Sequence, residues 1–234
     1  MIPRGTEVTS TVQTVLTGLG LTEIAVNAMP RVLVLTSGHE VIEPGESLTA
    51  GKIYNSNRAM ICGLLEDLGF HKITHYHVSD APEELDSEIN HVLQLSEDAD
   101  IIISSGGVSV GLFDTMPLIY EKLGAKSIYE RIQMRPGAAS YGAVTPKGQI
   151  IFGLSGNPGA AFNGWHLIVA PTLKRYKGLK NWTTPVVACV MDSEIFKRNA
   201  FDRYVQGKVI FGGGAPRFVA NRHFNSSSML GLYT

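Results

Sequence analysis

The most constraining feature of the sequence is the segment 101–111, IIISSGGVSVG, in which an apolar run passes directly into a glycine-rich turn. Three β-branched residues in succession are typical of a strand that is buried on both faces, as in a parallel sheet. The small residues Ser104, Ser105, Gly106 and Gly107 then let the backbone approach a ligand and direct N–H groups at an anion. The segment therefore predicts a strand that ends at a ligand site, although a plain strand-to-helix turn has a similar composition.

Strand-like and helix-like segments alternate over the first two-thirds of the chain. Apolar runs predict strands, and apolar residues at helical spacing between them predict helices, the last of which is bent near Pro171. The expected strands are 23–26, 31–35, 73–78, 101–104, 127–132, 140–144 and 149–154, the last two forming a hairpin, and the expected helices are 7–19, 56–68, 82–95, 114–123 and 158–173. The helix at 7–19 is expected to pack through its apolar face. This order predicts an α/β fold of three layers, with a mainly parallel sheet and helices on both faces.

The pattern changes after Gly178. Short β-like runs follow at 186–191, 204–211 and 217–220, without helices between them. We therefore expect two domains. The first is an α/β domain over residues 1–178, whose residues 1–30 are a lead-in helix and strand, and the second is a small β-rich domain over residues 179–234.

Composition excludes several classes of protein. The 234 residues have a net charge of -1 and are 44% hydrophobic and 18% charged, which is typical of an ordinary globular protein and argues against a general nucleic-acid binder. No apolar run is long enough for a membrane span, and the N-terminus lacks the apolar core of a signal peptide, so we expect a cytoplasmic protein without a membrane partner. Cys62 and Cys189 form no metal-binding motif and are expected to be buried thiols.

Three predicted loops would share one edge of the sheet, because each follows the carboxyl end of a strand. In open parallel sheets ligands collect at this edge. These loops are 36–40, 104–114 and 155–158. Their serine and asparagine side chains can hydrogen-bond a polar ring or a phosphate, and Glu40 with Asp114 could hold a divalent cation.

Simpler interpretations remain open for several residues. Asp114 could be only the N-cap of the following helix, and His39 beside Glu40 could be only a solvated polar residue. The four histidines between residues 71 and 91 lack zinc-ligand spacing, so we interpret them as surface or strand residues: His71, His75, His77 and His91.

Four motifs together resemble the molybdopterin molybdenumtransferase family, of the MoeA and gephyrin E-domain type. The resemblance runs from Gly5 to about Gly178 and rests on TSGHEVIEPGESLTAGKIYNSN (36–57), ISSGGVSVGLFD (103–114), RIQMRPG (131–137) and FGLSGNPGAA (152–161). The segment SGGVSVG followed by aspartate is specific to this family among relatives with the same pterin-binding module.

The resemblance implies a reaction and a set of site residues. Family members take adenylated molybdopterin and molybdate, release AMP with help from a divalent cation such as Mg²⁺, and leave molybdenum on the dithiolene. The implied catalytic residues are Asp114, Glu40 and Asp80, of which Asp114 and Glu40 would bind the metal ion. The implied cofactor-binding residues are Thr36, Gly38, Ser104, Ser105, Gly106, Gly107, Ser109, Arg131, Arg135, Gly156, Asn157 and Pro158. The family also implies a homo-oligomer.

The sequence departs from the family pattern at five positions. His39 and Asn55 stand where the family has aspartates, Ala138 and Ala139 where it has Lys-Pro, and Ser155 where it has proline. From the resemblance we also expect that the chain begins where family members begin their third structural region and that its C-terminal barrel is shortened. These departures leave three hypotheses open: a molybdenumtransferase or a module of one, a non-catalytic molybdopterin-binding or carrier protein, and a structural remnant that acts only through oligomer contacts.

Overall fold

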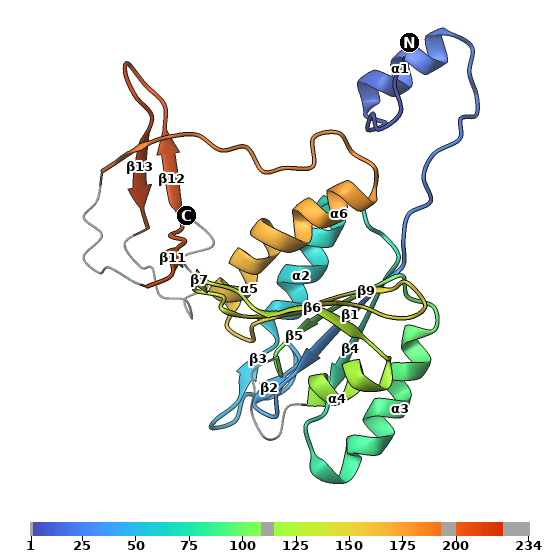
Figure 1. Ribbon diagram of the computed structural model, residues 1–234, viewed down its shortest axis with the longest axis vertical. Coiled ribbons are helices and arrows are strands. Elements are labelled where there is room, and N and C mark those ends of the chain that lie inside the picture. Colours follow the sequence, from blue (N-terminus) through green and yellow to red (C-terminus); the bar gives the residue numbers. More distant parts are fainter. Residues whose placement is uncertain (1, 109–114, 193–199, 222–234) are drawn as a thin grey trace.

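The computed structural model describes residues 2–108, 115–192 and 200–221. Its centre is a six-stranded sheet with helices on both faces (Figure 1). The four strands that come first in the order are mutually parallel, and the fifth is antiparallel to both of its neighbours. From one edge to the other they are β4 (Ile73–Val78), β1 (Val32–Ser37), β5 (Ile101–Ser105), β9 (Ile150–Leu154), β8 (Ala139–Val144) and β6 (Lys126–Arg131). The predicted three-layer α/β fold is confirmed.

Alternating side chains of the central strands build two separate cores. Val32 and Val34 of β1 belong to one core, whereas Leu33 and Leu35 belong to the other. All six residues of β1 are buried, as expected for a parallel strand covered on both faces. The hairpin of β8 and β9 is confirmed, and its turn contains Gly148 at a φ of 84°.

Two groups of helices cover the two faces. One face carries α2 (Ser56–Asp67), α5 (Pro158–Gly164), a π-helical stretch (Trp165–Val169) and α6 (Ala170–Tyr176). The other carries a 3₁₀ turn (Pro82–Glu84), α3 (Leu85–Ser96) and α4 (Thr115–Lys122). The predicted irregularity near Pro171 is the π-helical stretch, in which the Ala170 N–H reaches back to the Trp165 carbonyl. No helix within the described residues has the length and apolar character needed to cross a bilayer.

Short strands lie outside the central sheet. The predicted β-rich region contains a three-stranded sheet of β10 (Val190–Met191), β13 (Arg217–Ala220) and β12 (Gly207–Ile210). Two further pairs are β2 (Val41–Ile42) with β3 (Ile53–Tyr54), and β7 (Met134–Arg135) with β11 (Asp202–Arg203). The domain boundary at residue 178 stays a prediction.

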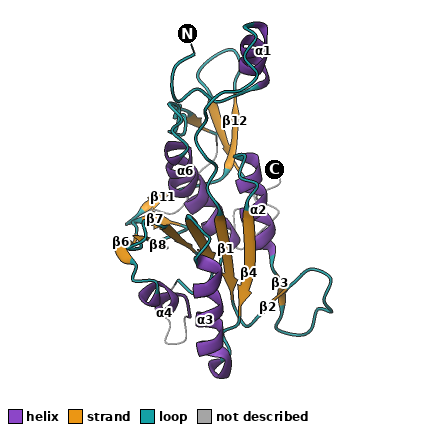
Figure 2. Cartoon of the chain, turned by 90° about the vertical axis from the view of Figure 1, so that its right-hand side faces the viewer, coloured by secondary structure: helices purple, strands orange, loops and turns teal. Residues whose placement is uncertain are grey.

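The first thirty residues and the two thiols differ from expectation. Helix α1 (Ser10–Gly18) buries no residue and lies far from the central sheet (Figures 1 and 2), so the prediction that it packs is wrong. Residues 23–26 form no strand, because no neighbouring strand pairs with them and their apolar side chains Ile24 and Val26 are exposed. Cys62 and Cys189 are free thiols, but each is only partly buried.

Candidate functional site

A pocket of about 910 Å³ lies at the carboxyl ends of β1, β5 and β9. The three predicted loops contribute to it, together with the segment between β2 and α2 and the residues after β4. Because β1, β5 and β9 are adjacent and parallel, their carboxyl ends meet at one edge of the sheet. The prediction that these loops share one edge is therefore confirmed.

Glycines allow the loop after β5 to lie against the end of β1. Gly106 and Gly107 have φ angles of 91° and 59°, a region that favours glycine. A Cβ added to Gly106 would lie 2.5 Å from the Ser37 carbonyl oxygen, and one added to Gly107 would lie 2.9 Å from the Ser37 hydroxyl. The Gly106 N–H donates to the Leu154 carbonyl at 3.2 Å, so this amide joins two loops instead of facing an anion, as the sequence had suggested.

Asn57, which was not among the expected site residues, connects the loops. It is the second residue of α2, is 9% exposed and lines the pocket. Its Nδ2 donates to the Ser105 hydroxyl and to the Gly156 carbonyl, both at 2.8 Å. One amide group thus holds the ends of β5 and β9 against the start of α2.

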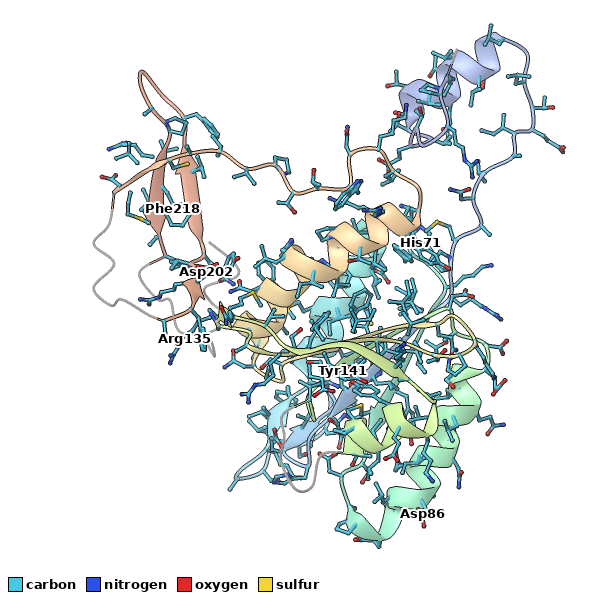
Figure 3. The ribbon with its side chains drawn as sticks, viewed as in Figure 1. His71, Asp86, Arg135, Tyr141, Asp202 and Phe218 are labelled. Atoms are coloured by element: carbon cyan, nitrogen blue, oxygen red, sulfur yellow. The ribbon has the colours of Figure 1, made fainter. Side chains whose placement is uncertain are left out.

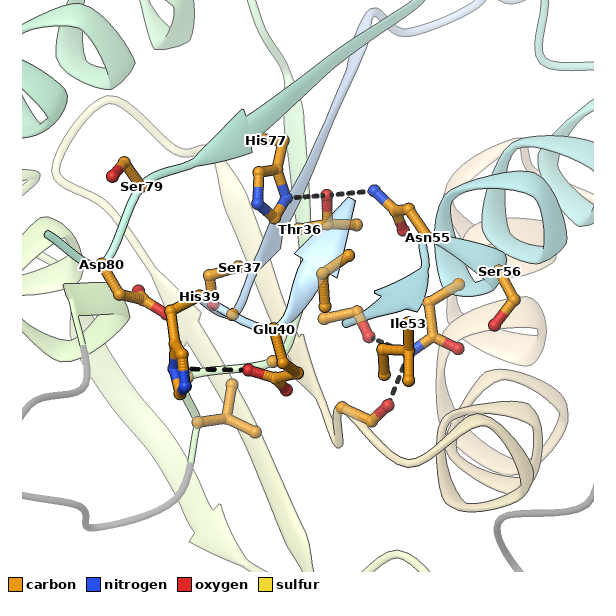
Figure 4. A pocket seen from close by; sticks show the side chains of 18 of the residues that line it. Thr36, Ser37, His39, Glu40, Ile53, Asn55, Ser56, His77, Ser79 and Asp80 are labelled. Carbon is orange, nitrogen blue, oxygen red and sulfur yellow. Dashed lines mark hydrogen bonds and ion pairs between the residues drawn. The ribbon is translucent and has the colours of Figure 1, made fainter. Parts of the chain in front are cut away.

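A second buried network surrounds Thr36. Its hydroxyl accepts a hydrogen bond from Asn55 Nδ2 at 2.9 Å and lies 3.1 Å from His77 Nδ1 (Figure 4). It also lies 3.0 Å from His75 Nε2. Asn55 also caps α2 and donates to Glu43. Four buried residues of these two networks line the pocket, and we call them the pocket floor: Thr36, Asn55, Asn57 and Ser105.

Two pKa shifts accompany this network. Burial and the nearby Arg58 guanidinium lower the pKa of His75 to about 4, although Glu43 opposes the shift. Burial would by itself raise the pKa of Glu43, but hydrogen bonds from Asn55 and Arg58 outweigh it and leave that pKa below its ordinary value. At neutral pH the imidazole of His75 is therefore uncharged and Glu43 is ionised.

Charged and titratable side chains surround the mouth of the pocket, and we call them the pocket rim: His39, Glu40, Lys52 and Asp80. His39 Nδ1 lies 3.5 Å from Glu40 Oε2, and its side chain is 88% exposed (Figure 4). Lys52 donates to the His39 carbonyl, and Asp80 accepts from the Thr115 hydroxyl at 3.3 Å. Across residues 2–108, 115–192 and 200–221, no group of three His, Cys, Asp or Glu side chains is placed to hold a metal ion.

The expected site residues divide into three groups. Those that line the pocket are Thr36, Gly38, Glu40, Asp80, Ser105, Gly106, Gly107, Gly156 and Pro158. Ser109 and Asp114 lie outside the described residues, so their roles stay predictions. Those that do not line it are Ser104, Arg131, Arg135 and Asn157.

The residues outside the pocket are held elsewhere. Ser104 is fully buried and its hydroxyl bonds to Tyr120, while Asn157 caps α5 through the Ala160 N–H. Arg131 ends β6, and Arg135 lies in β7, which pairs with β11 near Asp202 (Figure 3). The two arginines that the resemblance implied as cofactor-binding residues therefore lie on strands away from the pocket, and their roles stay predictions.

Comparison with known proteins identifies the family. A family model described as "probable molybdopterin binding domain" matches residues 33–175, which include every strand of the central sheet and all the loops around the pocket. The chain belongs to this family. The resemblance that the four motifs indicated is thereby confirmed.

Individual relatives agree with this assignment. The chain is 34% identical over 218 residues to a "molybdopterin molybdenumtransferase" of Staphylococcus aureus, covering 93% of this chain and 51% of the relative, and 32% identical to one of Staphylococcus epidermidis, covering 89% and 49%. The chain thus spans about half the length of these relatives. The crystal structure of a molybdopterin biosynthesis MoeA protein from Pyrococcus horikoshii has the same fold, with a TM-score of 0.77 at 23% identity, over 98% of this chain and 54% of that one.

Proposed function

We propose that the pocket binds molybdopterin or adenylated molybdopterin and that the chain takes part in inserting molybdenum from molybdate, with release of AMP. The observation that carries the proposal is the meeting of three loops around one pocket inside the segment that matches the molybdopterin-binding family. A pocket of about 910 Å³ is within the range that accommodates a cofactor-sized ligand. The similarity to molybdenumtransferases supports the transfer step.

The floor and the rim suit different parts of such a ligand. The floor offers neutral amide and hydroxyl groups that are held by buried hydrogen bonds, which fit a polar ring system. Glu40 and Asp80 lie at the mouth, where a cation could meet the phosphate groups of the ligand.

The acidic residues of the rim fit Mg²⁺ in part. Mg²⁺ bound to a nucleotide commonly takes one or two carboxylates, with phosphate oxygens and water completing its six ligands. Glu40 and Asp80 would supply such carboxylates, with Asp114 as a further predicted ligand. The cation would offset phosphate charge and polarise the bond to the leaving AMP. Mg²⁺ therefore stays part of the proposal.

One observation favours the second hypothesis, a molybdopterin-binding or carrier protein without transfer activity. Among the described residues, Lys52 is the one lysine or arginine that lines the pocket, and its ammonium group is bonded to the His39 carbonyl. Positive charge aimed at phosphate and molybdate is a large part of catalysis in such reactions. A pocket with so little of it is better suited to binding than to bond cleavage.

Two measurements decide between these functions. Calorimetric titration with molybdopterin tests binding, and incubation with adenylated molybdopterin, molybdate and Mg²⁺ tests AMP release. Binding with AMP release supports the transferase, and binding without release supports the carrier under conditions in which a full-length relative is active. Absence of binding would overturn both and leave only a structural role.

A further inference from the structure

The histidines of β4 are more than strand residues, because both meet the hydroxyl of Thr36. In the register of the sheet, Thr36 pairs with His77 and Val34 pairs with His75. Since alternate residues of a strand share a face, both imidazoles reach the same side of β1. His77 lines the pocket, whereas His75 lies behind it and does not. The hydroxyl of Thr36, which is 2% exposed, lies between the two rings.

The hydrogen-bond donors and acceptors of this network can be counted. Asn55 Oδ1 accepts from the Arg58 N–H at 3.1 Å and Nδ2 donates to the Glu43 carboxylate at 2.7 Å, which fixes the orientation of the amide. Asn55 must therefore donate its second amide hydrogen to Thr36. A hydroxyl has one hydrogen and two lone pairs, so one hydrogen and one lone pair remain for two imidazoles. One ring must donate to Thr36 and the other must accept from it.

Neutral imidazole side chains favour the tautomer that carries its hydrogen on Nε2, and this preference chooses the direction of the chain. If His75 donates from Nε2 and His77 accepts at Nδ1, both rings are in the favoured form. The opposite direction would require the less favoured Nδ1–H form in both rings. Burial and Arg58 oppose a second proton on the His75 ring, because together they keep the pKa of this residue low.

We propose that His75 donates to Thr36, that Thr36 donates to His77, and that His77 thereby presents its Nε2–H to the pocket as a donor for an acceptor oxygen of the ligand. Within the described residues, the Nε2 of His77 has no hydrogen-bond partner. Asn55 and His75 both donate to Thr36, so one chain of hydrogen bonds runs from them to the ligand, and the bonds of such a chain strengthen each other. His77 is then a ligand-contact residue, and Thr36 and His75 are positioning residues that set its tautomer.

This inference rests on the proposed function for the identity of the ligand, and its chemistry narrows that ligand. A neutral donor matches a carbonyl oxygen of a pterin ring or a phosphate oxygen, which share the acceptor role. A hydrogen bond to a charged acceptor is stronger than one to a neutral acceptor. Comparing the binding of molybdopterin with that of a pterin that lacks phosphate therefore shows whether the acceptor is the ring carbonyl oxygen or a phosphate oxygen.

The tautomers can be measured without any ligand. Long-range proton–nitrogen correlation spectra of the protein labelled with ¹⁵N-histidine distinguish protonated from bare ring nitrogens. We expect Nε2–H in both His75 and His77 at neutral pH. Thr36→Val should alter the signals of both rings, whereas Thr36→Ser, which keeps the hydroxyl, should preserve them. Protonated Nδ1 in His77 would overturn the proposed direction of the chain.

The ligand contact is tested by two substitutions of one residue. His77→Phe keeps a ring but removes the donor, and His77→Gln keeps an N–H near the position of Nε2. We expect molybdopterin affinity to fall by about tenfold or more in His77→Phe and by less than about threefold in His77→Gln. An equal loss for the phosphate-free pterin identifies the ring carbonyl as the acceptor, and a loss confined to molybdopterin identifies the phosphate.

The failures of the two proposals are distinguishable. Wild-type protein that does not bind molybdopterin overturns the proposed function and the ligand contact, while the spectra still decide the tautomers. Wild-type protein that binds, together with a His77→Phe variant of unchanged affinity, overturns the contact alone. Thermal unfolding of each variant establishes whether it is folded. If His77→Phe does not fold, the affinity of His77→Gln still tests the contact.

Discussion

The floor and the rim of the pocket are built in different ways. Floor residues are between 2% and 9% exposed, and their hydrogen bonds run to other buried groups of neighbouring strands and loops. Rim residues are partly or largely exposed, and the contact of 3.5 Å between His39 Nδ1 and Glu40 Oε2 faces solvent. The floor is therefore fixed by the same packing that fixes the sheet, whereas the rim contributes charge without contributing much stability.

The largest effect on stability is expected at Gly106, which follows the floor residue Ser105 and lies against the backbone of Ser37. In Gly106→Ala the new Cβ would lie 2.5 Å from the Ser37 carbonyl oxygen at a φ of 91°, so contact and conformation both oppose it. We expect the free energy of unfolding to fall by more than about 3 kcal/mol, measured by urea denaturation. Gly148→Ala is the matched control, because its φ is 84° and no atom lies within 4 Å.

Gly148→Ala isolates the cost of the left-handed conformation, which is about 1–2 kcal/mol. The difference between the two variants then measures how closely the loop after β5 approaches the end of β1. Equal losses in both would mean that these two segments separate freely, and the floor would not be the rigid part of the pocket.

The second effect concerns the amide that joins three segments. Asn57→Ala removes the hydrogen bonds to Ser105 and Gly156, and we expect a loss of about 2 kcal/mol in the free energy of unfolding. Molybdopterin affinity should fall by about tenfold or more, because the ends of β5 and β9 are no longer held together. Calorimetric titration and thermal unfolding measure the two losses.

Asn163→Ala is the control for Asn57→Ala. Asn163 is also a buried asparagine, 6% exposed, but it does not line the pocket and its amide donates to the Pro136 carbonyl at 3.5 Å. We expect this variant to lose some stability and to keep its affinity. A parallel loss of affinity would show that general softening of the fold, and not the join at Asn57, explains the binding defect.

A smaller, pH-dependent effect is expected beneath the floor. The pKa of His75 is about 4 in the folded chain and about 6.5 when unfolded, so between these values the unfolded chain binds more protons. Stability should therefore be fully present above pH 6.5 and decrease as the pH falls toward 4. We expect a loss of about 1–2 kcal/mol after allowance for solvent screening. The pH dependence of urea unfolding, compared with that of His75→Gln, measures it.

His75→Gln removes the titrating group but keeps an N–H donor for Thr36. Its plot of unfolding free energy against pH should be flatter than that of the wild type between pH 4 and 6.5. Identical curves would show that His75 is protonated as easily in the folded as in the unfolded chain, which would contradict a buried and neutral imidazole.

The floor also shows which parts of the site could be predicted from sequence. The strands and their loops were found because apolar runs and glycines are local signals, as in Ile101–Ser105 followed by Gly106 and Gly107. The contact between Thr36 and His77 was not found, because it depends on the register between β1 and β4, which local composition does not specify. The family resemblance likewise implied that Arg131 and Arg135 approach the pocket, although both lie on strands beyond its lining.

The peripheral segments were mispredicted for a related reason. The helical spacing of Val8, Val12 and Val15 predicted a helix, and α1 forms, but spacing cannot specify what a helix packs against. The apolar residues at 24–26 likewise predicted a strand without a partner to pair with. Local patterns thus predicted elements, whereas contacts between distant segments decided the floor.

The smallest effect on stability, and the one that separates the rim from the floor, is expected for Glu40→Gln and Asp80→Asn. Both side chains lie at the solvent-facing mouth, so the free energy of unfolding should change by no more than about 0.5 kcal/mol. If the chain is a transferase, AMP release with molybdate and Mg²⁺ should fall by about tenfold or more, because charge that would meet the cation is removed. Molybdopterin affinity without Mg²⁺ should stay the same.

Glu83→Gln is the control for these rim variants, because Glu83 is an exposed acid near Asp80 that does not line the pocket. It should leave stability, affinity and AMP release unchanged. Rim variants that release AMP normally would remove Glu40 and Asp80 from the proposed chemistry. Rim variants that unfold as easily as Gly106→Ala would remove the distinction itself, since the carboxylates would then hold the loops together as the buried amides do.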